Sequence, residues 1–316
     1  MHILVTGGCG YIGTNLTNRL LDDGYQVTVV DLMWFGNYLE NHENLIVIKS
    51  DIREIDQVPM KGIDSIIHLA NIANDPTGDL NPKLTWEVNV LASMLLIEKA
   101  IKNGVKQFIY ASSGSVYGVK DEPEVTEDLS LLPISDYNKT KMISERVFLS
   151  YRDKIILQII RPATVCGYSP RMRLDLSVNI LTKQAIQNNR ITVFGGSQVR
   201  PNVHIEDLAD AYIHFLNNPE IDGIYNVGFE NLSILEIAEL VRNHVPAEIV
   251  ITESNDPRSY RVNSDKLLAT GFAPKRTVED AVREIIDSVH SGLLTEEDHF
   301  HNLRWMKKTL FAGTST

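Results

Sequence analysis

The chain has few of the features that define several classes of protein. Its 316 residues include only two cysteines, Cys9 and Cys166, so it has neither a disulfide framework nor the paired ligand spacing of a structural zinc site. No apolar run approaches the roughly 20 residues that a membrane-spanning helix needs. The formal net charge of -11 argues against the clustered positive surface that binds nucleic acid or anionic membranes. We therefore expect no metal, no nucleic acid and no membrane as partners.

The rest of the composition is ordinary for a folded chain. Hydrophobic residues make up 43% of the sequence and charged residues 22%, and neither an internal repeat nor a low-complexity segment interrupts it. The first residues form a strand pattern directly, without the charged and apolar regions of a secretory signal. A cytoplasmic, reducing location is the expectation.

The N-terminal half alternates short apolar segments with longer helical ones. Runs rich in Ile and Val that are apolar on both faces are typical of buried parallel strands. Six strands are predicted, at His2–Val5, Gln26–Val30, Leu45–Lys49, Ser65–Leu69, Gln107–Ala111 and Ile155–Ile160. Helices are predicted between them, notably over Pro82–Lys102 and Asp136–Tyr151. This alternation predicts an α/β fold with a doubly wound parallel sheet.

The C-terminal half has a looser pattern, with no second regular series of strands. One apolar run, Gly223–Gly228, is expected to return to the first sheet as its last strand. Helices are predicted at Leu174–Gln187, Glu206–Leu216, Ser233–His244 and Val278–Ser288. We predict a cofactor-binding domain over residues 1–165, to which 191–228 partly returns. A smaller, interleaved substrate-binding lobe would comprise residues 166–190 and 229–316.

A glycine-rich segment follows the first predicted strand and opens a helix. Its residues Gly7, Gly10, Tyr11, Ile12 and Gly13 form a turn of the kind that lets backbone N–H groups approach a pyrophosphate at a helix N-terminus. The motif alone is weak evidence, but its place between a strand and a helix strengthens it.

Two aspartates at predicted strand ends extend this dinucleotide site. Asp31 ends the second predicted strand, where a carboxylate accepts the ribose hydroxyls of NAD and repels the 2′-phosphate of NADP. Because no Arg follows in Leu32–Trp34, NAD is the expected cofactor. Asp51, with Ile52, follows the third strand at the place of the adenine, although an ordinary strand-end Asp explains it equally well.

A tyrosine and a lysine are candidates for acid–base catalysis. Tyr137 and Lys141 are four residues apart, on one face of a helix that Ser135 or Asp136 could cap. A tyrosine titrates near 10 and acts as a base at neutral pH only when a cation stabilises its phenolate, a charge that Lys141 could supply. A tyrosine and a lysine at this spacing often occur together by chance. This pair gains weight from the strand end at Tyr110–Ser113, because strand carboxyl ends face the ligand crevice.

Several landmarks now occur in order: the glycine loop, Ser112–Gly118, Tyr137–Lys141 and Arg161–Val165. Together with Arg200–Leu208 and Asp256–Tyr260, they resemble the extended short-chain dehydrogenase/reductase family, whose members act on nucleotide sugars. The resemblance covers nearly the whole chain. It implies a Rossmann fold, NAD as cofactor, a nucleotide-sugar substrate, and a homodimer formed through a four-helix bundle.

The resemblance also implies roles for individual residues. Tyr137 would be the base, Lys141 its electrostatic partner, and Ser113 the hydroxyl that hydrogen-bonds the reacting oxygen. The implied cofactor-binding residues are Gly7, Gly10, Tyr11, Ile12, Gly13, Asp31, Asp51, Ile52, Leu69, Ala70, Tyr137, Lys141, Pro162 and Val165. The implied substrate-binding residues are Ser113, Asn179, Arg200 and Arg258, the last three at the diphosphate.

Other polar residues have competing interpretations. Arg171 and Arg173 are further candidates for contacting the diphosphate, with a surface role as the alternative. Asn89 matches a family asparagine, for which a structural role is at least as plausible as a catalytic one. His68 and His204 are interpreted as core histidines, and Cys166 as a small packing residue.

The reaction is narrowed by two residues after Ser113. In the family, 4,6-dehydratases carry an Asp-Glu pair where this chain has Gly114 and Ser115, and 3,5-epimerases carry a Cys at the position of Ser115. A 4-epimerase is therefore the first hypothesis. A 4-dehydrogenase or reductase is the second, because Ser169–Leu176 resembles a branch that includes GDP-heptose 4-dehydrogenases. A non-catalytic NAD-binding sensor is a third, disfavoured because both Tyr137 and Lys141 are present.

Overall fold

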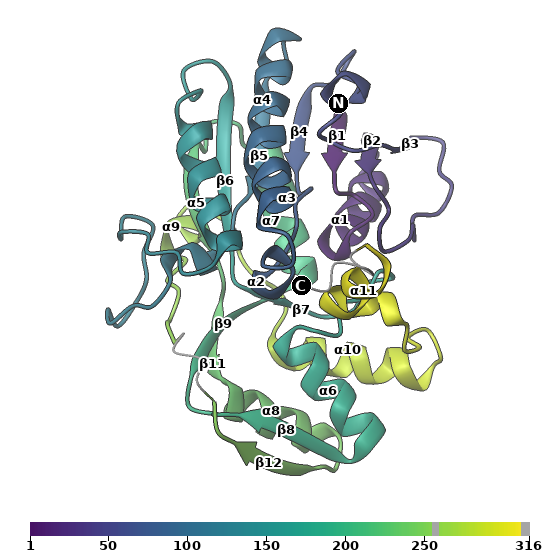
Figure 1. Ribbon diagram of the computed structural model, residues 1–316, viewed down its shortest axis with the longest axis vertical. Helices are drawn as coiled ribbons and strands as arrows, with labels where there is room; N and C mark the ends of the chain where they lie inside the picture. Colours follow the sequence, from purple (N-terminus) through teal and green to yellow (C-terminus); the bar gives the residue numbers. More distant parts are fainter. Residues whose placement is uncertain (255–258, 311–316) are drawn as a thin grey trace.

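The computed structural model describes residues 1–254 and 259–310 and is organised around one large parallel sheet (Figure 1). Within these residues its strand order is β10-β6-β5-β4-β1-β2-β3, and all neighbouring strands are parallel. The strands are β1 (His2–Thr6), β2 (Gln26–Asp31), β3 (Leu45–Lys49), β4 (Ser65–His68), β5 (Gln107–Ala111), β6 (Ile156–Pro162) and β10 (Gly223–Val227). The predicted doubly wound α/β fold is confirmed, including the returning last strand.

Helices cover both faces of this sheet, which is why its central strands are apolar on both sides. On one face, α1 (Tyr11–Asp22) and α7 (Ile205–Asn217) contribute to a core with Ile3 and Val5. On the other face, α4 (Ser93–Lys102) and α5 (Asp136–Leu149) pack with Leu4 and Phe108. The helix predicted from Pro82 to Lys102 is present as α3 (Pro82–Trp86), a π-helical segment η2 (Glu87–Ala92) and α4.

The second half contains strands that the sequence analysis did not predict. β7 (Thr164–Cys166), β9 (Val199–His204) and β11 (Glu230–Ser233) form one small sheet, and β8 (Arg190–Phe194) pairs with β12 (Glu248–Thr252). The expectation of no second strand series was wrong. β7, β9 and β11 are short and lack apolar runs, and β9 includes Pro201 and Asn202, but β12 has the apolar run Ile249–Ile251, which was missed. The helices beside them are α6 (Ser177–Asn188), α8 (Ile234–His244) and α10 (Val278–His290).

Helix α6 begins three residues later than predicted, because the backbone N–H of Leu174 donates to the carbonyl of Phe300 instead of entering a helix. The other short elements are η1 (Ile55–Gln57), α2 (Asp75–Gly78), η3 (Gly114–Tyr117), α9 (Asp265–Leu268), η4 (Asp298–Phe300) and α11 (Asn302–Thr309). In Figure 1 the second half lies mainly below the carboxyl ends of the large sheet. Within the described residues, no helix combines the length and apolar character needed to cross a membrane.

Candidate active site

A cavity of about 610 Å³ lies at the carboxyl ends of the large sheet, where α/β proteins of this topology bind ligands. It brings together almost all of the residues predicted to bind cofactor or substrate. Lining it are Gly7, Gly10, Tyr11, Ile12, Gly13, Asp31, Asp51, Ile52, Leu69, Ala70, Ser113, Tyr137, Lys141, Pro162, Val165 and Arg200. Asn179 does not line it, and Arg258 lies outside the described residues.

The glycine loop at one end of the cavity is shaped to bring backbone close to a ligand. Gly7 has a φ of +77°, and a Cβ there would lie 2.6 Å from the backbone nitrogen of Ala70. At Gly13 a Cβ would lie 2.2 Å from the carbonyl oxygen of Gly7. Because Gly10 at the N-cap of α1 offers no side-chain acceptor, the first N–H groups of this helix are left for an anion. These residues fit the pyrophosphate of a dinucleotide.

Asp31 lies at the end of β2 and lines the same cavity. Its carboxylate accepts hydrogen bonds from the backbone N–H groups of Cys9, at 3.0 Å, and Met33, at 2.7 Å. Burial raises the pKa of Asp31, although these two hydrogen bonds partly oppose the shift. The fixed carboxylate fits a ribose with free hydroxyl groups. Asp51 is held differently, since Arg53 donates to its carboxylate at 2.6 Å.

The candidate catalytic residues meet at the other end of the cavity. Ser135 caps α5 by accepting a hydrogen bond from the backbone of Asn138, so the helix presents Tyr137 and Lys141 on one face. The ammonium of Lys141 donates to the carbonyl of Ala111 at 2.6 Å and lies 5.9 Å from the centre of the Tyr137 ring. The Ser113 hydroxyl lines the same cavity and lies 2.7 Å from that of Ser115.

Burial shifts both titrating groups of this pair toward their neutral forms. Desolvation raises the pKa of Tyr137 to about 12; Asp75 adds to the shift, and the Ser113 hydrogen bond and the cation of Arg173 oppose it. Desolvation lowers the pKa of Lys141 to about 7, against the attraction of Glu145. A lysine that is poised near neutrality beside a tyrosine is suited to reversible proton transfer.

A buried ion pair supports this end of the site from behind. Glu145, one turn after Lys141, accepts two hydrogen bonds from the guanidinium of Arg161, at 2.9 and 2.6 Å. The Ser112 hydroxyl also donates to Glu145. Asn89 bridges Ile72 and Thr140 by hydrogen bonds, so it joins the loop after β4 to α5 without lining the cavity.

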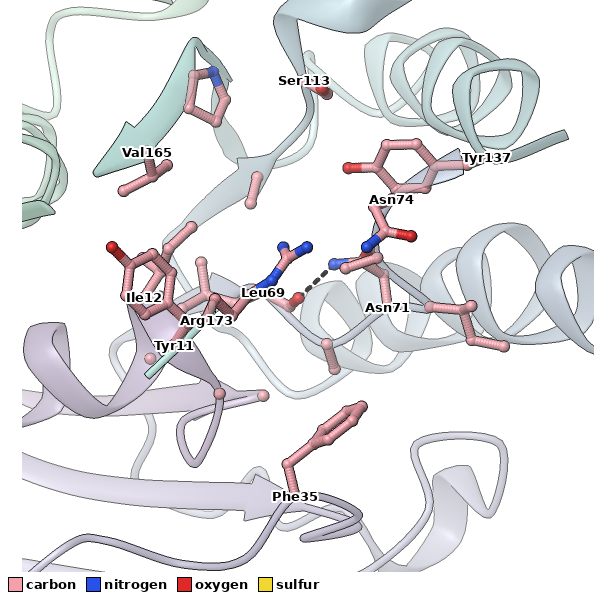
Figure 2. A pocket seen from close by; sticks show the side chains of 18 of the residues that line it. Tyr11, Ile12, Phe35, Leu69, Asn71, Asn74, Ser113, Tyr137, Val165 and Arg173 are labelled. Carbon is pink, nitrogen blue, oxygen red and sulfur yellow. Dashed lines mark hydrogen bonds between the residues drawn. The ribbon is translucent and has the colours of Figure 1, made fainter. Parts of the chain in front are cut away.

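Figure 2 shows residues in the cavity to which sequence analysis gave no role or an uncertain one. The guanidinium of Arg173 projects into its middle and is held by Asp175, at 2.9 and 3.1 Å. The Asn74 side chain donates to Asp175 at 3.3 Å, and its backbone has the unusual φ of 75°. Phe35, from the loop after β2, lines the opposite end. Arg171 is buried and the Arg173 side chain is only 12% exposed and lines the cavity, so the surface alternative for them was wrong.

Asn179 is buried beneath the cavity rather than inside it. Its side chain accepts a hydrogen bond from the backbone of Gly167 at 3.2 Å and donates to the Tyr11 hydroxyl at 3.2 Å and the Arg173 carbonyl at 2.9 Å. These contacts fix Arg173 and Tyr11 relative to one another. Its direct contact with a diphosphate stays a prediction, as does that of Arg200.

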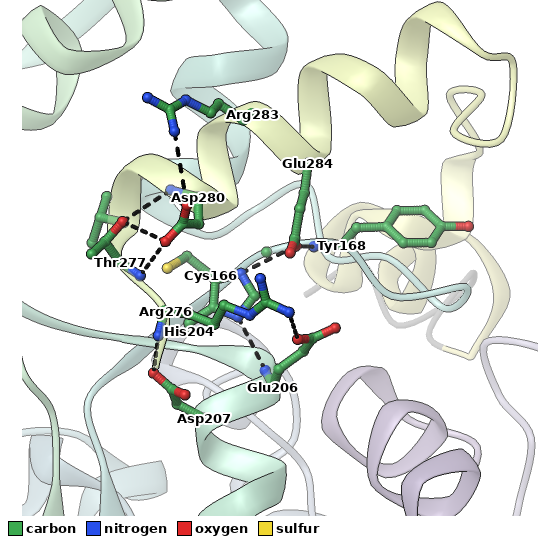
Figure 3. Close-up of polar contacts among 12 residues, drawn as sticks. Cys166, Tyr168, His204, Glu206, Asp207, Arg276, Thr277, Asp280, Arg283 and Glu284 are labelled. Carbon is green, nitrogen blue, oxygen red and sulfur yellow. Dashed lines mark hydrogen bonds and ion pairs between the residues drawn. The ribbon is translucent and has the colours of Figure 1, made fainter. Parts of the chain in front are cut away.

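The two histidines have different surroundings. His68 is enclosed between the hydroxyls of Thr6 and Ser93, both at 2.7 Å, and burial lowers its pKa to about 3. His204 lies beside the buried Cys166 and contacts Glu284 at 3.1 Å (Figure 3). Glu206 is also near, but an ion pair of 3.0 Å with Arg276 engages it. Both histidines are satisfied by partners, as expected.

This fold and cavity define a dinucleotide-dependent enzyme of the short-chain dehydrogenase/reductase type, with a Tyr–Lys pair facing the cofactor end of a parallel sheet. The chain belongs to the NAD dependent epimerase/dehydratase family, whose family model matches residues 3–228.

Similar proteins of known identity include nucleotide-sugar 4-epimerases, together with a UDP-glucuronic acid decarboxylase from Danio rerio. The UDP-glucose 4-epimerase of Halalkalibacterium halodurans is 30% identical over 307 residues, which cover 87% of this chain and 91% of that protein. The structure of Thermotoga maritima UDP-glucose 4-epimerase with UDP-glucose matches with a TM-score of 0.83 and 26% identity, covering 93% of this chain and 100% of that one. The structure of Bacillus cereus UDP-glucuronic acid 4-epimerase with UDP-glucuronic acid and NAD matches with a TM-score of 0.81 and 27% identity, covering 92% of this chain and 99% of that one.

Proposed function

We propose that this protein is an NAD-dependent nucleotide-sugar epimerase that inverts carbon 4 of the sugar through a transient 4-keto intermediate. The observation that carries the proposal is the makeup of the catalytic end of the cavity. Tyr137, Lys141 and Ser113 supply one proton-transfer system, which is all that a 4-epimerase requires. The family membership and the 4-epimerases among its relatives support this choice.

Different residues of the cavity would have different roles in such a reaction. Ser113 hydrogen-bonds the 4-hydroxyl oxygen and orients it toward Tyr137. Tyr137, as the phenolate that Lys141 stabilises, takes the hydroxyl proton and later returns it to the same oxygen. NAD, held by the glycine loop and Asp31, supplies a reversible hydride acceptor. After the keto-sugar turns, the same groups act on its other face.

A second acid–base system, which dehydration or 3,5-epimerisation would need, has no support in this cavity. At the dehydratase positions this chain has Gly114 and Ser115, and the Ser115 hydroxyl donates to Asn138. The cavity also contains Asp75 and Asp175, but Asp75 accepts a hydrogen bond from Ser135 and Asp175 is paired with Arg173. Both carboxylates are therefore engaged.

Isotope exchange tests the proposal. The enzyme is incubated in deuterium oxide with UDP-glucose, UDP-galactose and other nucleotide hexoses in turn, and the products are followed by proton NMR. A 4-epimerase gives two C4 isomers in equilibrium without ring deuteration, because the hydride that leaves is the one that returns. Ring deuteration would overturn the proposal, and no turnover of any nucleotide sugar would favour a non-catalytic NAD sensor.

A 4-dehydrogenase is the second candidate, because Ser169–Leu176 resembles a branch with that activity and contributes Arg171, Arg173 and Asp175 to the cavity. In the same experiment it would form a keto-sugar and at most one equivalent of NADH per subunit, unless an external acceptor reoxidised the cofactor. Turnover that depends on an acceptor would make it the preferred function.

We also propose that the protein forms a homodimer through the α3–η2–α4 helix and α5, which would pair with their copies in a four-helix bundle. Leu91 and Trp86 are exposed on this helix, whereas Val88 and Phe148 belong to the chain's own core. Light scattering should give twice the chain mass at micromolar concentration, and Leu91→Glu should shift it toward the monomer. A wild-type monomer would contradict the dimer.

A further inference from the structure

Arg171 has an unusual environment for an arginine. It is the largest of the fully buried side chains, with 1% of its surface exposed, yet it lines the cofactor cavity. It follows β7, about 140 residues along the chain from Asp31, and its guanidinium carbon lies 4.2 Å from the centre of the Phe35 ring. The fold therefore places a cationic side chain beside the loop that contains Phe35, which has no Lys or Arg of its own.

The hydrogen bonds of Arg171 leave the guanidinium incompletely satisfied. Its Nη2 donates to the side-chain oxygen of Asn302 at 2.6 Å, and its Nη1 to the Met172 carbonyl at 3.2 Å. The Nε–H group is buried without any partner. Among the described residues, no carboxylate is hydrogen-bonded to this guanidinium, which offers five N–H donors in all.

Arg161 shows how the same chain buries an arginine for structural purposes. Arg161 is 2% exposed, but its guanidinium makes a bidentate pair with Glu145 and also donates to Tyr117 at 2.7 Å. A buried cation without a carboxylate partner is costly, because burial removes its hydration and the two hydrogen bonds of Arg171 replace it only in part. Burial and the neighbouring cation of Arg173 accordingly lower the pKa of Arg171 to about 9. A ligand with acceptor oxygens in the cavity would supply the missing partner.

The surroundings of the two arginines show which part of the ligand each one faces. The guanidinium carbon of Arg171 lies 4.2 Å from the ring of Phe35, in the loop after β2, the strand that ends at Asp31. Arg173, by contrast, is paired with Asp175, which also accepts a hydrogen bond from Asn74. The position of Arg171 beside the loop after β2 places it at the adenosine end.

We propose that Arg171 is a cofactor-binding residue whose guanidinium donates a hydrogen bond to the adenosine half of NAD, at the ribose or its adjoining phosphate, opposite Asp31. The C-terminal helix α11 positions it: Asn302 holds the guanidinium, and the Trp305 indole N–H donates to the Trp34 carbonyl at 2.7 Å. The inference rests on NAD as cofactor but not on which reaction follows.

Binding measurements on full-length protein freed of nucleotide test this role without turnover. Calorimetry with NAD, ADP-ribose and UDP compares the wild type with Arg171→Met. Loss of a charged hydrogen bond should weaken NAD and ADP-ribose binding by about 10- to 100-fold and leave the affinity for UDP unchanged. Arg304→Met, an exposed position on the same helix α11, is the matched control and should bind all three ligands like the wild type.

Circular dichroism would reveal whether Arg171→Met misfolds. Two further variants test the proposal in that case. Arg171→Lys keeps the buried charge but cannot reproduce the planar fork, and Asn302→Leu removes only the group that positions it. Both should weaken ADP-ribose binding by several-fold. Unchanged ADP-ribose affinity in a folded Arg171 variant would overturn the proposal. A loss of UDP affinity instead would place Arg171 at the substrate diphosphate and overturn it equally.

Discussion

Replacing Lys141 with methionine removes the cation on which the base function of Tyr137 depends. The Lys141 ammonium lies 5.9 Å from the centre of the Tyr137 ring, and because Lys141 is buried and Tyr137 half-buried, solvent screens their interaction only in part. At that separation and an effective dielectric constant of about 20, Coulomb's law gives about 3 kcal/mol of phenolate stabilisation, or about two pKa units. At a pH below the Tyr137 pKa, Lys141→Met should therefore lower kcat by about 100-fold.

The assay is the pH dependence of kcat with whichever nucleotide sugar turns over. The wild-type Tyr–Lys pair should titrate with shared apparent pKa values, and in Lys141→Met the ascending limb should move up by about two pH units. Lys139→Met is the matched control, because Lys139 lies on the same helix but is exposed and faces Asp136 at 3.7 Å. A pH profile that does not move in Lys141→Met, despite intact NAD binding, would refute the electrostatic role.

Three further outcomes are expected. Tyr137→Phe should keep NAD binding by calorimetry but lower turnover on the order of 100- to 10,000-fold, the usual contribution of a placed acid–base group, and near-normal activity would contradict its role. Asp31→Ser should weaken NAD binding and reduce the difference between the NAD and NADP affinities in direct binding measurements. Equal wild-type affinity for both cofactors would contradict the role of Asp31 at the ribose. Lys141→Met should also unfold at a higher temperature than the wild type near pH 7. Burial lowers the pKa of Lys141 from 10.5 to about 7, so between these pH values the unfolded state binds more protons than the folded state. Wild-type stability therefore rises with pH over this range, and the difference in unfolding temperature between the two proteins should close toward pH 10.5. A difference in unfolding temperature that does not change with pH would contradict the lowered pKa of Lys141.

The regular half of the fold could be predicted from the sequence because its signals are local. Buried parallel strands show as short Ile- and Val-rich runs, and β3 and β5 begin and end where predicted. Several strands of the second half carry no such signal, although β12, with Ile249–Ile251, does. β7 has three residues and β9 contains a proline, so their pairing depends on the fold around them.

The candidate site divides in the same way. The sequence by itself determined the residues whose roles follow from neighbours along the chain: the glycine loop before α1, Asp31 at a strand end, and Tyr137 and Lys141 one helical turn apart. Only the tertiary structure decided what burial and distant contacts do to these groups. It lowers the pKa of Lys141, and it brings Arg171 to the loop of Phe35 under a helix some 130 residues further on. Desolvation and long-range packing depend on which segments meet in space, and the spacing of residues along a chain does not encode that.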